Sequence, residues 1–210
     1  MSGTEEPPSS RSASFDALVC RLEINPEQAD DLFSTLSSCK VVLLLDDSGS
    51  MRTRVPDPMS APYAFGGPTT RWSELAMLAH NCIDLVASVA PAGLDCAFLN
   101  RPAIPGVTSY DAVAPAFASG SSLCGSTPMI TRLRELFEVY NPVAAGGQRV
   151  LIVILTDGAP SDGTPQDLFN LLRNGRHANI HISLAVMTED QYTMAFLDGW
   201  DQQLLNFDTR

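Results

Sequence analysis

Oxygen-bearing side chains occur in two short stretches of the chain, in a pattern that suits a metal ion. Residues 46–50 place Asp46, Ser48 and Ser50 at alternating positions, so that one carboxylate and two hydroxyls can converge on one point. A second carboxylate, Asp157, follows another apolar segment much later in the chain. Hard oxygen donors without His or Cys suit Mg²⁺, and also Mn²⁺ or Ca²⁺, better than Zn²⁺. These residues predict a site for one such divalent ion.

Two apolar segments must position these donors. Residues 41–45 are uninterrupted Val and Leu, and residues 149–155 are apolar after a leading Arg; both are followed by aspartates. Continuous apolar runs of this length are typical of strands buried on both faces, as in a parallel sheet. Ligands of open α/β sheets bind outside the carboxyl ends of the strands. We therefore predict an α/β fold with the metal site at that edge of the sheet.

Three motifs follow one another along the chain in a recognisable order. Asp-x-Ser-x-Ser spans residues 46–50, Gly-Ser-Thr-Pro-Met spans 125–129, and Thr-Asp-Gly spans 156–158. Together they resemble the von Willebrand factor type A (VWA) family and its metal-ion-dependent adhesion site (MIDAS), and the resemblance covers residues 40–208. The one departure is Met129, where the family usually has Leu. This swap conserves side-chain volume and is expected to be tolerated.

The resemblance implies the VWA fold: a single domain of the doubly wound, Rossmann-like α/β type, with a mostly parallel sheet flanked by helices. It also adds a threonine to the ligands, so that the predicted metal site consists of Asp46, Ser48, Ser50, Thr127 and Asp157. In such a site, an Asp or Glu carboxylate of a protein partner completes the coordination of the ion. The implied function is adhesion-type, divalent-metal-dependent protein–protein interaction, with no catalytic residue and no enzyme activity.

Two other functions fit parts of the pattern. A Mg²⁺-dependent hydrolase of the haloacid-dehalogenase phosphatase type also has a strand ending in aspartate. It needs a second aspartate two residues on, where this chain has Ser48, and a lysine late in the chain, whereas Lys40 is the only lysine. Alternatively, the oxygen atoms form a purely structural hydrogen-bond network, in which the Thr127 hydroxyl caps the helix that follows it. The residues favour metal binding over both alternatives.

Other residues lie beside the predicted site along the chain. Arg52 and Arg54 place positive charge next to it on an otherwise acidic protein, where they would steer an acidic ligand. Segment 52–68, with its prolines, is too long for an ordinary connection, so we expect it to rim the metal face. Asp162 follows the second aspartate loop and is either a rim residue or a solvated turn residue.

The sequence divides into three parts. Residues 1–14, rich in Ser, Pro and Glu, are predicted to be a disordered tail. Residues 15–39 are predicted to be an N-terminal helical extension, and residues 40–210 to be the VWA domain. Within the extension we expect helices over 15–22 and 26–37. Members of the family commonly have a last helix against the sheet, and our hypothesis is that the helix at 26–37 occupies that groove.

Periodicity and breaking residues predict the remaining elements. Beyond the two strands already described, the expected strands are 94–99, 106–109, 180–187 and 205–208. The expected helices are 70–90, 111–118, 127–140, 164–174 and 189–204, the last with a break at Gly199. Strands and helices therefore alternate over most of the chain, which is typical of the α/β class.

Composition limits the partners and the compartment. The 210 residues include 24 acidic and 13 basic side chains, with a net charge of −11, whereas nucleic-acid binding requires a basic surface. No apolar run reaches the ~18 residues of a membrane span. Five cysteines, an odd number without Cys-x-x-Cys spacing, favour free thiols in a reducing compartment. We therefore expect a protein ligand, no nucleic acid, no membrane insertion and an intracellular, cytoplasmic location.

Overall fold

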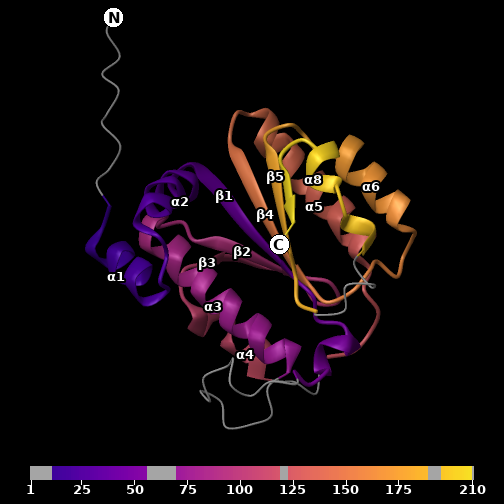
Figure 1. Cartoon of the computed structure of the whole chain (residues 1–210), viewed down its shortest axis with the longest axis horizontal. Coiled ribbons are helices and arrows are strands. Elements are labelled where there is room, and N and C mark those ends of the chain that lie inside the picture. The colour runs from indigo at the N-terminus through magenta and orange to yellow at the C-terminus, as the bar shows by residue number, and fades with distance from the viewer. Residues whose placement is uncertain (1–10, 56–69, 119–122, 189–194, 210) are drawn as a thin grey trace, which may run out of the picture.

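A six-stranded sheet forms the centre of the molecule (Figure 1). The computed structural model describes residues 11–55, 70–118, 123–188 and 195–209. The strands are β1 (Cys39–Leu45), β2 (Leu94–Phe98), β3 (Ile104–Val107), β4 (Arg149–Thr156), β5 (Ile180–Val186) and β6 (Phe207–Thr209). Only β3 runs antiparallel to its neighbour, and the other described pairings are parallel. The predicted single α/β domain with a mostly parallel sheet is confirmed.

Helices lie on both faces of this sheet. They are α1 (Ala13–Arg21), α2 (Pro26–Ser38), α3 (Arg71–Val89), α4 (Ala114–Ala118), α5 (Met129–Ala145), α6 (Pro165–Asn174) and α8 (Trp200–Gln203). Shorter 3-10 turns are η1 (Gly49–Arg52), η2 (Tyr110–Ala112) and η4 (Ala195–Leu197). Capping boxes at Thr70 and Thr164 start α3 and α6, because each threonine side chain accepts a backbone N–H of the first turn.

Strands β1 and β4 lie side by side where the order of the strands reverses. The sheet has the order β3-β2-β1-β4-β5-β6, which is that of a doubly wound fold. β1 and β4 pair in parallel along their length, ending with Leu45 opposite Leu155. Ligands of such sheets bind outside the carboxyl ends of the strands at this switch point. The loops that carry Asp46 and Asp157 begin there.

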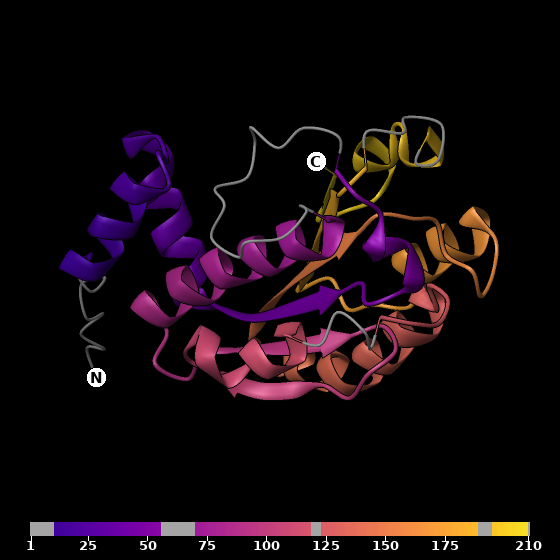
Figure 2. The ribbon, with the colours of Figure 1, turned by 90° about the horizontal axis from the view of Figure 1, so that it is seen from below.

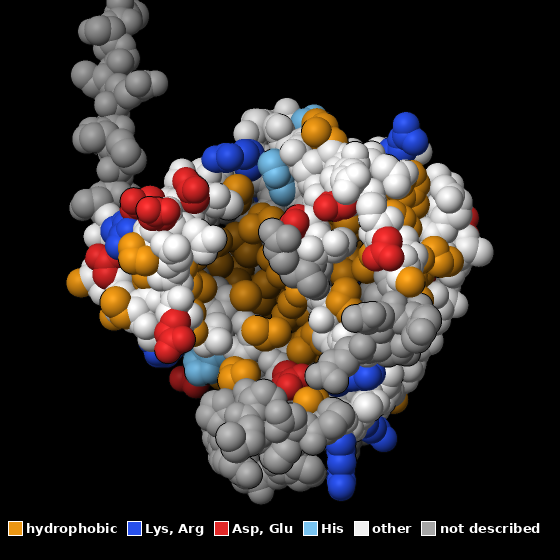
Figure 3. Space-filling view, in the orientation of Figure 1, with side chains coloured by type: hydrophobic (Ala, Val, Ile, Leu, Met, Phe, Trp, Pro, Cys, Tyr) orange, Lys and Arg blue, Asp and Glu red, His pale blue; other side chains and the backbone are white. Residues whose placement is uncertain are grey.

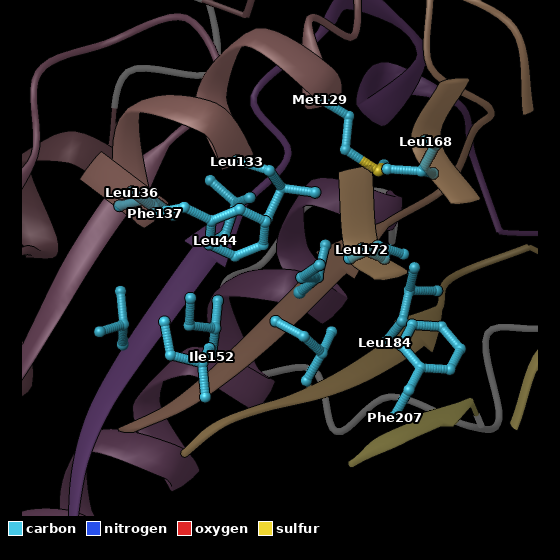
Figure 4. Packing of buried hydrophobic residues seen from close by; sticks show 14 of the residues in the cluster. Leu44, Met129, Leu133, Leu136, Phe137, Ile152, Leu168, Leu172, Leu184 and Phe207 are labelled. Carbon is cyan, nitrogen blue, oxygen red and sulfur yellow. The ribbon is translucent and has the colours of Figure 1, made fainter. Parts of the chain in front are cut away.

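Helices α5 and α6 cover one face of the sheet (Figure 4). Leu44, Ile152 and Leu184 project from three neighbouring strands into this core and are fully buried. Met129, the first residue of α5, is 1 % exposed and lies beside Leu168 of α6 in Figure 4. The methionine side chain therefore occupies a core position, as a leucine of similar volume would.

Helices α1, α2 and α3 cover part of the opposite face. Leu43 of β1 and Leu75 of α3 are fully buried there, together with Phe15 of α1. The ring of Phe15 packs edge-on against Phe33 of α2, with 5.3 Å between the ring centroids. Figures 1 and 2 place α1 and α2 at the end of the sheet where β1 begins. The N-terminal helices therefore pack on the domain, at the opposite end of β1 from Asp46.

A part of this second face is open. Figure 3 shows hydrophobic side chains lining a hollow in the centre of the view, between the helices at its sides. Val153 and Ala185 belong to this face and are only partly buried, whereas Ile152 and Leu184 on the other face are fully buried. Helix α2 packs against α3 and β1 and lies beside the hollow. The hypothesis that helix 26–37 fills the groove over the sheet is therefore wrong.

The predicted N-terminal boundary needs correction. Helix α1 begins at Ala13, and the Ser12 hydroxyl caps it by accepting the N–H of Phe15 at 3.2 Å. The predicted tail 1–14 therefore extends too far, because the helix already starts at the Ser12 cap. Residues 1–10 lie outside the described residues.

Two strand predictions also shift. The third strand is Ile104–Val107 and not 106–109; Pro105 and Gly106 argue against a central strand but are tolerated at the edge of a sheet. The last strand begins at Phe207, because Asn206 turns the chain with a φ of 51°. Where a helix was expected over 189–204, residues 189–194 are not described, and Gly199, with a φ of 75°, separates η4 from α8.

Candidate metal centre

Hydrogen bonds join three loops at the carboxyl end of β1. The N–H of Asp46 donates to the carbonyl of Leu155 at 2.9 Å, which continues the pairing of β1 with β4. A second contact joins the ends of the same two strands: the Thr156 hydroxyl donates to Asp46 Oδ2 at 2.6 Å. The third loop is held by Gly49, whose N–H donates to the carbonyl of Gly125 at 3.3 Å. Segments far apart in the sequence therefore meet at the predicted site.

Four of the five predicted ligands are connected by short contacts. Ser50 Oγ donates to Asp157 Oδ1 at 2.8 Å, and Ser48 Oγ lies 3.0 Å from Ser50 Oγ. Because Ser50 gives its one hydroxyl proton to Asp157, Ser48 must be the donor in the second contact. The Ser48 N–H also donates to Asp46 Oδ1 at 2.9 Å. This connected set runs from one aspartate loop to the other.

Asp46 is a carboxylate in an unfavourable environment. Asp46 is 1 % exposed and Asp157 is 3 % exposed. Burial raises the pKa of Asp46 above its ordinary value; hydrogen bonds from Ser48 and Thr156 oppose this rise, and the negative charge of Asp157 adds to it. A divalent cation between the two carboxylates would offset both the burial and the repulsion. The electrostatics of the site therefore favour a bound cation.

Thr127, the fifth predicted ligand, lies in the third loop just before α5. It is 8 % exposed, and its N–H donates to Ser161 Oγ at 2.9 Å. Within the part of the chain that the structure describes, its hydroxyl neither caps α5 nor bonds to the other four residues. The alternative that Thr127 is the helix cap is therefore wrong.

Asp162 performs the capping role instead. Its Oδ1 accepts the N–H of Ile130 at 3.2 Å, and its Oδ2 accepts the N–H of Thr131 at 2.7 Å. Burial alone would raise the pKa of Asp162, but these hydrogen bonds outweigh it and the pKa is lowered. Both carboxylate oxygens serve the first turn of α5. Asp162 is therefore an exposed loop residue, as one of the two alternatives predicted, and it also caps α5.

Arg71, which was not among the predicted site residues, binds one of the candidate ligands. It is the first residue of α3, and its Nη1 donates to Asp157 Oδ2 at 2.7 Å. Its Nη2 donates to Thr188 Oγ1 at 3.0 Å. The side chain of Asp157 is 0 % exposed and that of Arg71 is 23 % exposed. A cation at a helix N-terminus is unfavourable, and this was the signal in the sequence that Arg71 needs an anionic partner.

The backbone around Arg71 is fixed as well. Its N–H donates to the carbonyl of Thr53 at 3.0 Å, and Arg54 pairs with Thr70 in an isolated antiparallel bridge. The chain that leaves η1 therefore returns to it at the start of α3. Most of the segment that was predicted to rim the metal face, residues 56–69, lies outside the described residues.

Asp47 points away from the candidate ligands into a separate buried ion pair. Its Oδ1 accepts the N–H of Asn100 and its Oδ2 accepts Arg101 Nε, both at 2.7 Å. The Arg101 guanidinium lies over the ring of Phe98, 4.4 Å from its centroid. Asp47 is 1 % exposed. It anchors the first loop to β2 and is not available as the second aspartate of a phosphatase.

The donor set fits a hard cation with few protein carboxylates. Among the described residues, no group of three or more His, Cys, Asp or Glu side chains could hold a metal ion. The candidate centre contains two carboxylates, Asp46 and Asp157, so hydroxyls and water must supply its other ligands. Mg²⁺ retains several waters and commonly uses only one or two carboxylates. The residues present therefore fit Mg²⁺.

Comparisons with known proteins do not assign the chain to a class. No protein-family model matches it, and no curated protein matches it either. Within the described segments, every helix is too short or too polar to cross a membrane. The topology of the sheet and the geometry at its carboxyl edge are therefore the grounds for assigning a function.

Proposed function

We propose that this chain is a divalent-metal-dependent protein-binding domain of the von Willebrand factor type A kind. One Mg²⁺ or Mn²⁺ ion is held by Asp46, Ser48, Ser50, Thr127 and Asp157, and an Asp or Glu carboxylate of a protein partner binds to this ion. The main support is the chain of contacts from Ser48 through Ser50 to Asp157 at the carboxyl ends of β1 and β4. It joins hydroxyl and carboxylate oxygens at the switch point of the sheet.

Exposure along this chain of contacts supports a binding role. Asp46, Ser48 and Asp157 are buried, whereas Ser50 is exposed. Solvent, an ion or a partner can therefore reach the cluster at Ser50, while its inner members are held by the protein. A network with only a structural role would not need an opening of this kind. The Thr127 hydroxyl, which does not cap α5, is the fifth oxygen that we assign to the ion.

The side chains around the ligands have separate roles. When bound, the ion supplies a Lewis-acidic position that accepts a carboxylate oxygen from the partner. Thr156 and Arg71 hold Asp46 and Asp157 by hydrogen bonds and do not need to be ligands. Arg54 is exposed just after η1, where its charge would attract an acidic partner.

Isothermal titration calorimetry with Mg²⁺ and Mn²⁺ tests the proposed site. We expect the wild-type protein to bind one ion, and Asp46→Asn to lose most of the affinity because a neutral amide replaces a charged ligand. Ser50→Ala, at an exposed position, should weaken binding without affecting folding. Asp31→Asn is the matched control, since it removes the same charge from an exposed site on α2. Wild-type protein that takes up no ion would instead support the structural network.

The partner and the absence of catalysis are tested separately. A protein partner that binds through a carboxylate should be released by EDTA and should not bind Asp46→Asn. A phosphatase assay with Mg²⁺ addresses the alternative hydrolase. We expect no turnover, because Asp47 is committed to Asn100 and Arg101. Turnover that Asp46→Asn abolishes would overturn the binding role.

A further inference from the structure

Arg71 places a fixed positive charge against the candidate metal ligands. Its guanidinium donates to Asp157 Oδ2 at 2.7 Å, on the carboxylate whose other oxygen accepts from Ser50. The Thr53 carbonyl and the Thr188 hydroxyl hold its backbone and its second terminal nitrogen. Arg71 therefore connects the start of α3 to the loops that follow β4 and β5. Its position is set independently of any bound ion.

The charges of the site can be counted from these contacts. When both are ionised, Asp46 and Asp157 contribute two negative charges and Arg71 one positive charge, while Asp47 is paired with Arg101. A bound divalent ion converts the remaining single negative charge into a single positive charge. Without Arg71, the ion would only neutralise the two carboxylates. The arginine therefore decides whether the loaded site is cationic or neutral.

We propose that Arg71 determines the ligand specificity of the metal site: it weakens the binding of the divalent cation and strengthens the binding of an anionic ligand to that cation. This role rests on the proposed function. The two effects have opposite signs because a fixed positive charge repels the ion and attracts the carboxylate. An arginine with only a structural role would, when removed, weaken both binding steps or neither.

Water-proton relaxation measurements with Mn²⁺ and acetate separate the two effects. Mn²⁺ binding is titrated first, in a buffer without carboxylates, and acetate is then added to displace water from the bound ion. For Arg71→Gln we expect Mn²⁺ to bind about tenfold more tightly, and acetate to bind about tenfold more weakly, than in the wild-type protein. Arg71→Lys retains the charge and should stay close to wild type in both titrations.

The matched control is Arg173→Gln, which removes an arginine from an exposed position in the last turn of α6. It should leave both titrations nearly unchanged, and circular dichroism should show all variants folded. Arg71→Gln that weakens both steps, or changes neither, overturns the role of Arg71 while leaving the metal site intact. Wild-type protein that does not bind Mn²⁺ overturns the proposed function as well, so the two failures can be distinguished.

Discussion

At the scale of single residues, the candidate centre buries Asp46 in an environment that disfavours its charged form, whereas Asp157 is paired with Arg71. The pKa of Asp46 is raised, chiefly by burial and further by the charge of Asp157. A carboxyl group whose pKa is raised by folding stabilises the protein at pH values below its ordinary pKa. This contribution is lost as the pH rises through the folded value. At pH values above its folded pKa and without metal, the ionised Asp46 therefore lowers the free energy of unfolding.

This environment predicts the effect of Asp46→Asn in EDTA. The unfolding free energy of the variant, relative to wild type, should increase as the pH rises above the ordinary aspartate pKa of 3.8, because only wild type has a carboxyl to ionise at this position. Urea unfolding of both proteins across this range measures the difference. A variant that gains nothing toward neutral pH would show that Asp46 does not carry the unfavourable charge.

Addition of Mg²⁺ should reverse the order of the two stabilities, so that wild type has a higher unfolding free energy than Asp46→Asn. An ion that binds only the folded state at a hundred times its dissociation constant stabilises it by about 2.7 kcal/mol. Wild type should gain this stability, and Asp46→Asn should gain little. The same urea titrations with Mg²⁺ in place of EDTA test it, with Asp31→Asn as a control that should follow wild type.

The side chains of the candidate site are easier to recognise in the sequence than the residues that hold them in place. Asp46, Ser48 and Asp157 were recognised because their types and spacing are local features of the chain. Thr156 and Arg71 were not, because their value depends on which carboxylate each reaches across the fold. Thr127 was predicted to be either a metal ligand or the cap of α5, and the cap could be assigned only by locating Asp162.

At the scale of elements, prediction worked where burial is complete and failed at the edges. β1 and β4 are central strands, and their continuous apolar runs identified them. β3 contains Pro105 and Gly106. Residue propensities alone therefore could not predict that this segment forms a strand, because proline is tolerated only at the edge of a sheet. The helix at 26–37 was also found, but its amphipathic pattern did not tell which surface it would cover.

The unequal covering of the two sheet faces predicts unequal costs of the same substitution. Val150 and Val153 belong to β4, and Val150 is 0 % exposed, whereas Val153 is only partly buried on the open face. Val150→Ala should lower the unfolding free energy by about 2–3 kcal/mol, and Val153→Ala by ~1 kcal/mol. Chemical denaturation of the two variants measures both values. Equal losses would mean that the second face is covered as fully as the first.

At the scale of the whole molecule, the net charge of −11 acts on any cation that approaches. Long-range attraction is strong at low ionic strength and is screened within about 8 Å at physiological salt. We therefore expect the Mg²⁺ affinity to fall by a factor of a few between low and physiological NaCl, while direct coordination persists. Calorimetry at the two salt concentrations measures this change. Affinity that vanishes in salt would indicate diffuse counterion attraction and no coordination.

Two contacts connect the chain just after η1 to the start of α3. They are the bridge between Arg54 and Thr70 and the hydrogen bond from the Arg71 N–H to the Thr53 carbonyl. These four residues tie both ends of the intervening peptide together, so its length need not affect the aspartate loops. A change of sequence between these two ends should therefore leave Arg71 in place against Asp157.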